Sequence, residues 1–296
     1  MAQAAVAEQS VDAAQLAARY GLQRGGERPT LVAYTRQVWA YRHFIAAFAT
    51  AKLVASFSSA RLGRLWQVLT PLVNAAVYFL LFGVVLNTRR NIDNFVAYLC
   101  IGIFLFTFTQ AVVFSGVGSI ADNLNLVRAL HFPRACLPIA LTLTQLQQML
   151  VSAGVLLVIV LVTGEPLTPW WLLVVPALLL QSLFNLGLAM IMARLGAKMT
   201  DLKQLMPFVM RTWMYGSGVF YSVQTFADHL PPAAANVLHA NPLMVYIELV
   251  RHALLTSPPL TSPPLRLWLL GIGWALVLSV GGYVFFWRGE QEYGRA

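Results

Sequence analysis

Long, uninterrupted apolar segments constrain this sequence more than any other feature. A helix needs about 20 apolar residues to cross a hydrocarbon core ~30 Å thick, whereas a strand of a lipid-embedded barrel alternates over ~10 residues. Backbone N–H and C=O groups inside a bilayer must be bonded within the protein, so these segments are expected to be helices. Six candidate spans can be placed, at residues 65–86, 95–120, 135–162, 170–192, 205–221 and 267–287. The sequence predicts an all-α, polytopic membrane protein with six transmembrane helices.

The remaining segments predict an order of parts and an orientation. Residues 1–35 form an expected cytoplasmic tail that lacks the apolar core of a secretory signal, and residues 63–296 form the six-span domain. Lysine and arginine gather in the segments that this orientation places inside, with only Arg89, Arg90, Arg251 and Arg266 outside. Both termini are then expected in the cytoplasm. The net charge of +9 is interpreted as a topology signal, and no nucleic-acid partner is expected.

Residues 36–62 predict an amphipathic helix along the inner membrane surface, before the first span. Tyr41, Phe44 and Phe48 recur at helical spacing, Trp39 is suited to the membrane interface, and Lys52 follows one turn after Phe48. A tilted start of the first span is the alternative reading.

Several classes of chemistry are excluded or disfavoured. No glycine begins a GxxxxGK[ST] phosphate loop, the histidines lack metal-ligand spacing, and no row of carboxylates lies inside the spans. Arg211 is the only ionisable side chain placed within a span, where it is either functional or extends to the lipid headgroups. No metal site is therefore predicted, and energy for any transport is expected from another chain.

Four motifs in one colinear order resemble the type-2 ABC exporter permeases that move polysaccharides. Residues 58–86 resemble the family's first-span motif, residues 125–138 its cytoplasmic loop, residues 198–202 the segment before span five, and residues 241–251 its outer segment. The first-span motif is matched at Leu62, Gly63, Leu65, Trp66, Leu69, Pro71, Leu72, Val77, Tyr78, Phe82 and Gly83. The resemblance covers about residue 36 to the carboxyl terminus.

The loop between spans two and three is expected to couple the chain to an ATPase. Pro133 cannot continue a helix, so residues 125–132 are predicted to form a short helix that ends there. The resemblance implies that this loop docks on a cytoplasmic ATPase subunit; an ordinary positive loop is the alternative. The expected coupling residues are Asn125, Arg128, Leu130, His131, Phe132, Pro133 and Arg134.

Aromatic and polar residues of spans two and five suggest a sugar path. Aromatic rings can stack on the C–H faces of sugars while hydroxyl and amide groups bond the sugar edges. Ordinary interfacial anchoring is the competing explanation. The candidate path residues are Tyr98, Phe104, Phe106, Phe108, Gln110, Arg211, Trp213, Tyr215 and Tyr221.

The long segment between spans five and six predicts an outer gate. Asn241 is placed to cap a helix that begins at Pro242, and Glu248 and Arg251 lie on that helix. The resemblance implies a pair of short re-entrant helices here.

These features together predict a transport subunit with no cofactor in this chain. The resemblance implies a homodimer in the bacterial cytoplasmic (inner) membrane, among membrane lipids, with ATP and Mg²⁺ held by a partner ATPase. The expected cargo is an undecaprenyl- or decaprenyl-diphosphate-linked glycan, such as an O-antigen, teichoic acid or cell-wall galactan. The alternatives are a type-2 ABC permease for a drug or lipid and a membrane-embedded glycosyltransferase, for which Asp122 and Asp201 are poor catalytic candidates.

Overall fold

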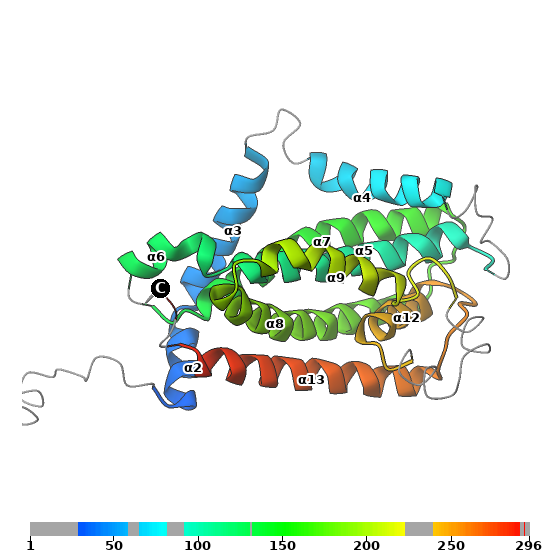
Figure 1. The fold of residues 1–296 in the computed structure, drawn as a ribbon. Helices are drawn as coiled ribbons and strands as arrows, with labels where there is room; N and C mark the ends of the chain where they lie inside the picture. Colours follow the sequence, from blue (N-terminus) through cyan, green and yellow to red (C-terminus); the bar gives the residue numbers. More distant parts are fainter. Residues whose placement is uncertain are drawn as a thin grey trace, which may run out of the picture.

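The computed structural model describes residues 29–58, 65–81, 92–130, 132–222, 239–290 and 293. Within these ranges the regular structure is entirely helical, which confirms the all-α prediction. Four helical segments are long and apolar enough to cross a membrane: α5 (Phe95–Gly118), α7 (Cys136–Val162), η4 with α8 (Pro169–Lys198) and α13 (Pro264–Arg288). They lie side by side as the body of the molecule (Figure 1).

Two predicted spans differ from the helices observed. In the first, α4 (Leu65–Tyr78) is followed by a wider turn at residues 79–81, and the rest of the predicted span lies outside the described residues. In the fifth, α9 (Leu202–Tyr215) has 14 residues, fewer than the ~20 that a span needs. The chain leaves the helix at Gly216, and Gly218 adopts a φ of 62°, a left-handed conformation that favours glycine.

The predicted interface helix is two helices. α2 (Leu31–Ala40) ends at Tyr41 and α3 (Arg42–Ser58) follows it at once. Both run across the direction of the long helices in Figure 1, as expected for elements at a membrane surface. The Thr144 hydroxyl donates to the Ala49 carbonyl at 3.2 Å, which joins α3 to α7. Leu62 and Gly63, at the predicted start of the first span, lie outside the described residues.

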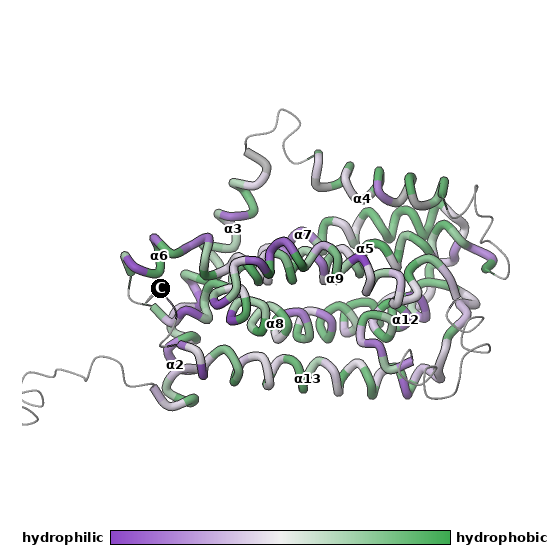
Figure 2. The backbone as a smooth tube through the Cα atoms, in the orientation of Figure 1, coloured by the Kyte–Doolittle hydropathy of each residue, from purple (hydrophilic) through white to green (hydrophobic). Residues whose placement is uncertain are grey.

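The central helix is α5, which packs against α4, α7, α8, α9 and α12 (Pro242–Leu254). Because α5 is apolar on almost every face, it has no surface suited to water, and most of its residues are buried. Figure 2 shows apolar residues along the middle of the long helices and hydrophilic ones gathered toward α6 (Leu124–Ala129) and α2.

Two glycines set the distance between α8 and α13. A Cβ on Gly187 would collide with the Leu278 carbonyl of α13, and a Cβ on Gly282 would collide with the Gly187 carbonyl. Helices associate in lipid by close van der Waals packing, which small residues permit. This backbone contact fixes α8 and α13 against each other.

Candidate transport sites

The connection between α5 and α7, here called the coupling segment, contains η3 (Ala121–Asn123), α6 and residues 130–135. Asn125 and Arg128 are exposed on α6, and the Leu130 side chain is 51% exposed. Val127 is buried and holds α6 to the bundle. His131 lies outside the described residues. The segment therefore presents a small polar and apolar surface at the end of the bundle that also carries α2 and the last turn of α13 (Figure 1).

The later part of the coupling segment is anchored rather than exposed. Phe132 packs against Phe44 of α3, with 5.2 Å between ring centroids, and Pro133 is buried. Phe44 also stacks on Phe48 at 5.7 Å, and the Lys52 ammonium lies 5.4 Å from the Phe48 ring centroid. The interface helix and the coupling segment therefore meet through their aromatic side chains.

A partly buried polar cluster joins the coupling segment to α2 and to the residues that follow α13. The Arg134 amide donates to the Glu290 carboxylate at 3.0 Å, and the Arg134 guanidinium donates to the Glu290 carbonyl. The Tyr34 hydroxyl of α2 donates to the same carboxylate at 2.6 Å and accepts from the Ala135 amide at 3.1 Å. Movement of the coupling segment must therefore act on α2 and on the segment after α13.

Burial controls the charge state of this cluster. Desolvation raises the pKa of the Glu290 carboxyl above its ordinary value, although the bonds from Tyr34 and Arg134 oppose that shift. Desolvation, with the nearby Glu290 charge, also raises the pKa of the Tyr34 phenol, so the phenol stays protonated and can donate. Sequence reasoning missed Tyr34 and Glu290 because neither lies in a motif and 256 positions separate them.

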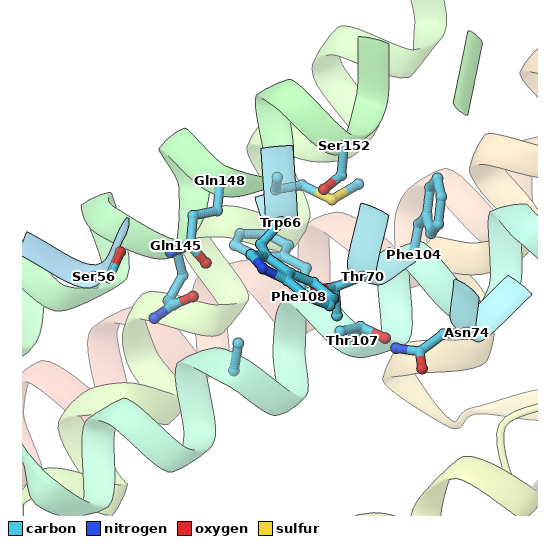
Figure 3. A pocket seen from close by; sticks show the side chains of 12 residues that line it. Ser56, Trp66, Thr70, Asn74, Phe104, Thr107, Phe108, Gln145, Gln148 and Ser152 are labelled. Carbon is cyan, nitrogen blue, oxygen red and sulfur yellow. The ribbon is translucent and has the colours of Figure 1, made fainter. Parts of the chain in front are cut away.

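The candidate sugar-path residues do not form one surface. Phe104 and Phe108 of α5 line a cavity of about 300 Å³ between α3, α4, α5 and α7, together with Trp66 of α4. Phe106 is 1% exposed and lies in the core, and Gln110 is partly exposed outside that cavity. The cavity, here called the membrane cavity, therefore collects only part of the predicted set (Figure 3).

The sequence reasoning missed the polar side of this cavity. Gln145, Gln148 and Ser152 of α7 line it, at i, i+3 and i+7 on one helix face. Polar residues in a stripe along an otherwise apolar helix are a recognisable sequence signal. Asn74 of α4 also lines the cavity, whereas the side chain of Pro71 on the same helix lies outside the description.

The predicted path residues on α9 and in the turn after it differ in exposure and in hydrogen-bond partners. Arg211 and Tyr215 are exposed on α9. Tyr221 lies beyond the helix, and its hydroxyl donates to the Tyr215 carbonyl at 2.7 Å. The Trp213 indole N–H donates to Asn241 Oδ1 at 3.1 Å, so this predicted path residue contacts the outer segment instead.

The outer helix α12 begins as predicted. Asn241 Oδ1 accepts from the Leu243 amide at 3.1 Å, which caps the helix, and Pro242 occupies its first position. The Asn241 side-chain amide also donates to the Gly216 carbonyl at 2.8 Å. The predicted partner helix of the gate falls in residues 223–238, outside the described part of the chain.

Arg251 holds the other end of α12. It is 1% exposed, and its guanidinium donates to the carbonyls of Tyr98 (3.1 Å), Gly218 (2.9 Å) and Val219 (3.0 Å). Its central carbon lies 3.3 Å from the Tyr98 ring centroid. Tyr98, a predicted path residue, is therefore buried beneath Arg251 and joins α5 to the outer segment.

Glu248 contacts the connection before α13 instead of forming a hydrogen bond with Arg251. Its carboxylate accepts from the Thr261 hydroxyl at 2.7 Å and from the Thr261 amide at 3.2 Å. We call Asn241, Glu248, Arg251 and their bonded partners the outer polar network.

Comparisons with known proteins agree with the sequence motifs. A family model described as "ABC-2 type transporter" matches residues 45–255. The O-antigen export system permease protein RfbA of Myxococcus xanthus is 28% identical over 215 residues, which are 72% of this chain and 81% of that protein. Two proteins of the same description from Klebsiella pneumoniae are 24% and 23% identical, each over 64% of this chain and 72% of the relative. Because the family match covers well over half of the sequence, this chain belongs to the ABC-2 type transporter family and is a multi-pass membrane transport subunit, not an enzyme.

Proposed function

We propose that this chain is the permease subunit of an exporter that moves a lipid-diphosphate-linked polysaccharide across the bacterial cytoplasmic membrane. The similarity to three O-antigen export permeases favours this cargo over a drug or a simple lipid. O-antigen, teichoic acid and cell-wall galactan are the candidate glycans. In this proposal two copies of the chain form the pore, with six spans each and both termini in the cytoplasm.

The observation that carries the proposal is the anchored coupling segment in a chain of this family. An ABC permease works with an ATPase subunit, and this sequence has no phosphate-binding loop of its own. Asn125, Arg128 and Leu130 offer contacts to such a subunit, while Phe132 and Arg134 tie the segment to α3, α2 and Glu290. ATP and Mg²⁺ would bind the partner, and its closure would act on the bundle through these ties.

Co-purification with the ATPase encoded by a neighbouring gene tests this assignment. We expect a stoichiometric complex with the unchanged chain, and its loss in Leu130→Glu, because a buried unpaired carboxylate would disrupt the docking surface. Leu167→Glu is the matched control, since Leu167 is a 73% exposed leucine at the opposite end of the bundle. A chain that purifies without any nucleotide-hydrolysing partner, or a Leu130→Glu variant that retains it, would contradict the assignment.

A further inference from the structure

The membrane cavity lies beside the middle turns of two helices that are long and apolar enough to cross a membrane. Its lining residues from α5 fall between positions 104 and 111, and those from α7 between 145 and 152, which are the middle parts of both helices. Its volume of about 300 Å³ is at the lower end of the ~300–1,000 Å³ range of small-molecule sites.

Hydrogen-bonding side chains face this cavity without partners. Within the described part of the chain, Asn74, Thr107, Gln145, Gln148 and Ser152 have no hydrogen-bond partner. Five hydrogen-bonding groups therefore face one cavity and can bond to a ligand that enters it.

The lining also defines the kind of ligand. It has no Lys, Arg, Asp or Glu, so it offers no counter-charge to a phosphate or to a cation. It does offer amides, which both donate and accept, and the aromatic side chains of Trp66, Phe104 and Phe108. Figure 3 shows Trp66 and Phe108 between the glutamines on one side and the Thr107 and Asn74 side chains on the other.

We propose that the membrane cavity binds an uncharged sugar ring of the exported glycan, and that the lipid diphosphate binds elsewhere. Aromatic faces stack on the C–H face of a sugar while amides and hydroxyls bond its edge, which matches this lining. The inference rests on the proposed function, because it requires a glycan cargo. It adds α4 and α7 to the sugar path and removes Phe106 from it.

Protection of an introduced cysteine tests the site in the permease co-purified with its ATPase. Ser152→Cys places a thiol in the cavity, whereas the two natural cysteines, Cys100 and Cys136, are buried. The probe is the host glycan released from its lipid by mild acid, compared with undecaprenyl diphosphate and with phosphatidylglycerol. We expect the released glycan alone to slow maleimide labelling of the Ser152→Cys variant severalfold. Leu150 of α7 is 58% exposed and does not line the cavity, so Leu150→Cys should label at the same rate with and without glycan.

Removal of the amides supplies the second measurement. With Gln145→Leu and Gln148→Leu added to the Ser152→Cys variant, we expect about tenfold more glycan to be needed for half-maximal protection, equivalent to ~1.4 kcal/mol. Gln147→Leu is the matched control, because Gln147 lies on the same helix but does not line the cavity. Equal protection with and without the two glutamines would overturn the proposal.

Three other outcomes would also overturn it. Slower labelling with undecaprenyl diphosphate or phosphatidylglycerol, in the absence of glycan, would make the cavity a lipid site. A Ser152→Cys thiol that does not label even without any ligand would mean that a second copy of the chain covers the cavity. Cells with the Gln145→Leu, Gln148→Leu variant that carry as much surface polysaccharide as cells with the unchanged chain would exclude the cavity from the sugar path. Failure of the proposed function is distinguishable from all three, because the unchanged chain would then neither bind an ATPase nor restore surface polysaccharide in a deletion strain.

Discussion

The outer polar network and the membrane cavity are both polar regions of an apolar bundle, but they differ in whether their groups are bonded. The side chains of Arg251 and Asn241 bond to seven backbone or side-chain groups at the outer end of the bundle. Gln145, Gln148 and Asn74 bond to none within the described residues. Bonded buried groups hold a structure together, whereas unbonded groups on a cavity wall can bond to a ligand.

This difference implies different mobility in the two regions. The outer network joins α12, the turn after α9 and the start of α5 into one unit. The cavity lies beside α4. Among the described helices, α4 has extensive contacts with α5 and α7 only. Widening of the cavity therefore needs only a movement of α4, whereas movement of α12 requires loss of the Arg251 bonds.

Arg251→Met should have the largest effect of any change in this comparison. It leaves the buried carbonyls of Gly218 and Val219 without the donors that Arg251 supplies, at about 1–3 kcal/mol each, in a site that 1% exposure closes to water. We expect the variant to lose its monodisperse peak in detergent and to restore no export. Arg266→Met, at an exposed arginine near the same end, should behave as the unchanged protein. A well-folded Arg251→Met protein would mean that the network is not structural.

Asn241→Ala should have an intermediate effect. It removes the cap of α12, worth about 1 kcal/mol, and leaves the Trp213 N–H without its acceptor. Asn241→Asp keeps both acceptor contacts and loses the amide donor to the Gly216 carbonyl and the Ser217 hydroxyl. The thermal midpoint measured in detergent should therefore fall in the order unchanged protein, Asn241→Asp, Asn241→Ala. The reverse order of the two variants would show that the Gly216 bond dominates.

Gln145→Leu with Gln148→Leu should leave the thermal midpoint unchanged or raise it, in contrast to its expected effect on glycan binding. The substitutions replace partly exposed amides with apolar side chains and break no hydrogen bond within the described residues. A gain of 1 kcal/mol would raise the midpoint by roughly 2–4 °C for a protein of 150–250 residues. A fall comparable to that of Arg251→Met would remove the distinction between the two regions.

Glu290→Gln should produce the smallest effect, and one that depends on pH. Because burial raises the folded-state pKa of Glu290 above its unfolded value, its contribution is fully present below the unfolded pKa and is lost as pH rises through the folded pKa. Lowering the pH from about 7 to about 5 should therefore stabilise the unchanged protein relative to Glu290→Gln. The difference in thermal midpoint between the two proteins measures this, and a difference independent of pH would contradict the raised pKa.

The sequence predicted best those features that depend on local pattern. Long apolar segments predicted α5, α7, α8 and α13, and the Asn241–Pro242 pair predicted the start of α12, because hydropathy and capping act over a few residues. The break at Tyr41 and the end of α9 at Tyr215 were missed, since apolar composition continues through both positions.

Contacts between segments far apart in the chain could not be predicted from the sequence. Tyr98 was predicted to line the sugar path, because a sequence does not show which residue packs on an aromatic side chain. In the structure it is buried under Arg251, 153 positions away. Arg251 was placed in a gate, but its donors are all directed into the protein. The polar stripe of α7 is visible in the sequence, but the sequence does not show that α4 and α5 lie opposite it and close the cavity.

The contact between Gly187 and Gly282 has a consequence for the gene. Every single-base missense change in a glycine codon introduces a side chain, and at either position that side chain would collide with the backbone of the neighbouring helix. A missense change at either codon is therefore expected to disturb the contact between α8 and α13, whereas a change at a codon for a cavity residue leaves that contact intact.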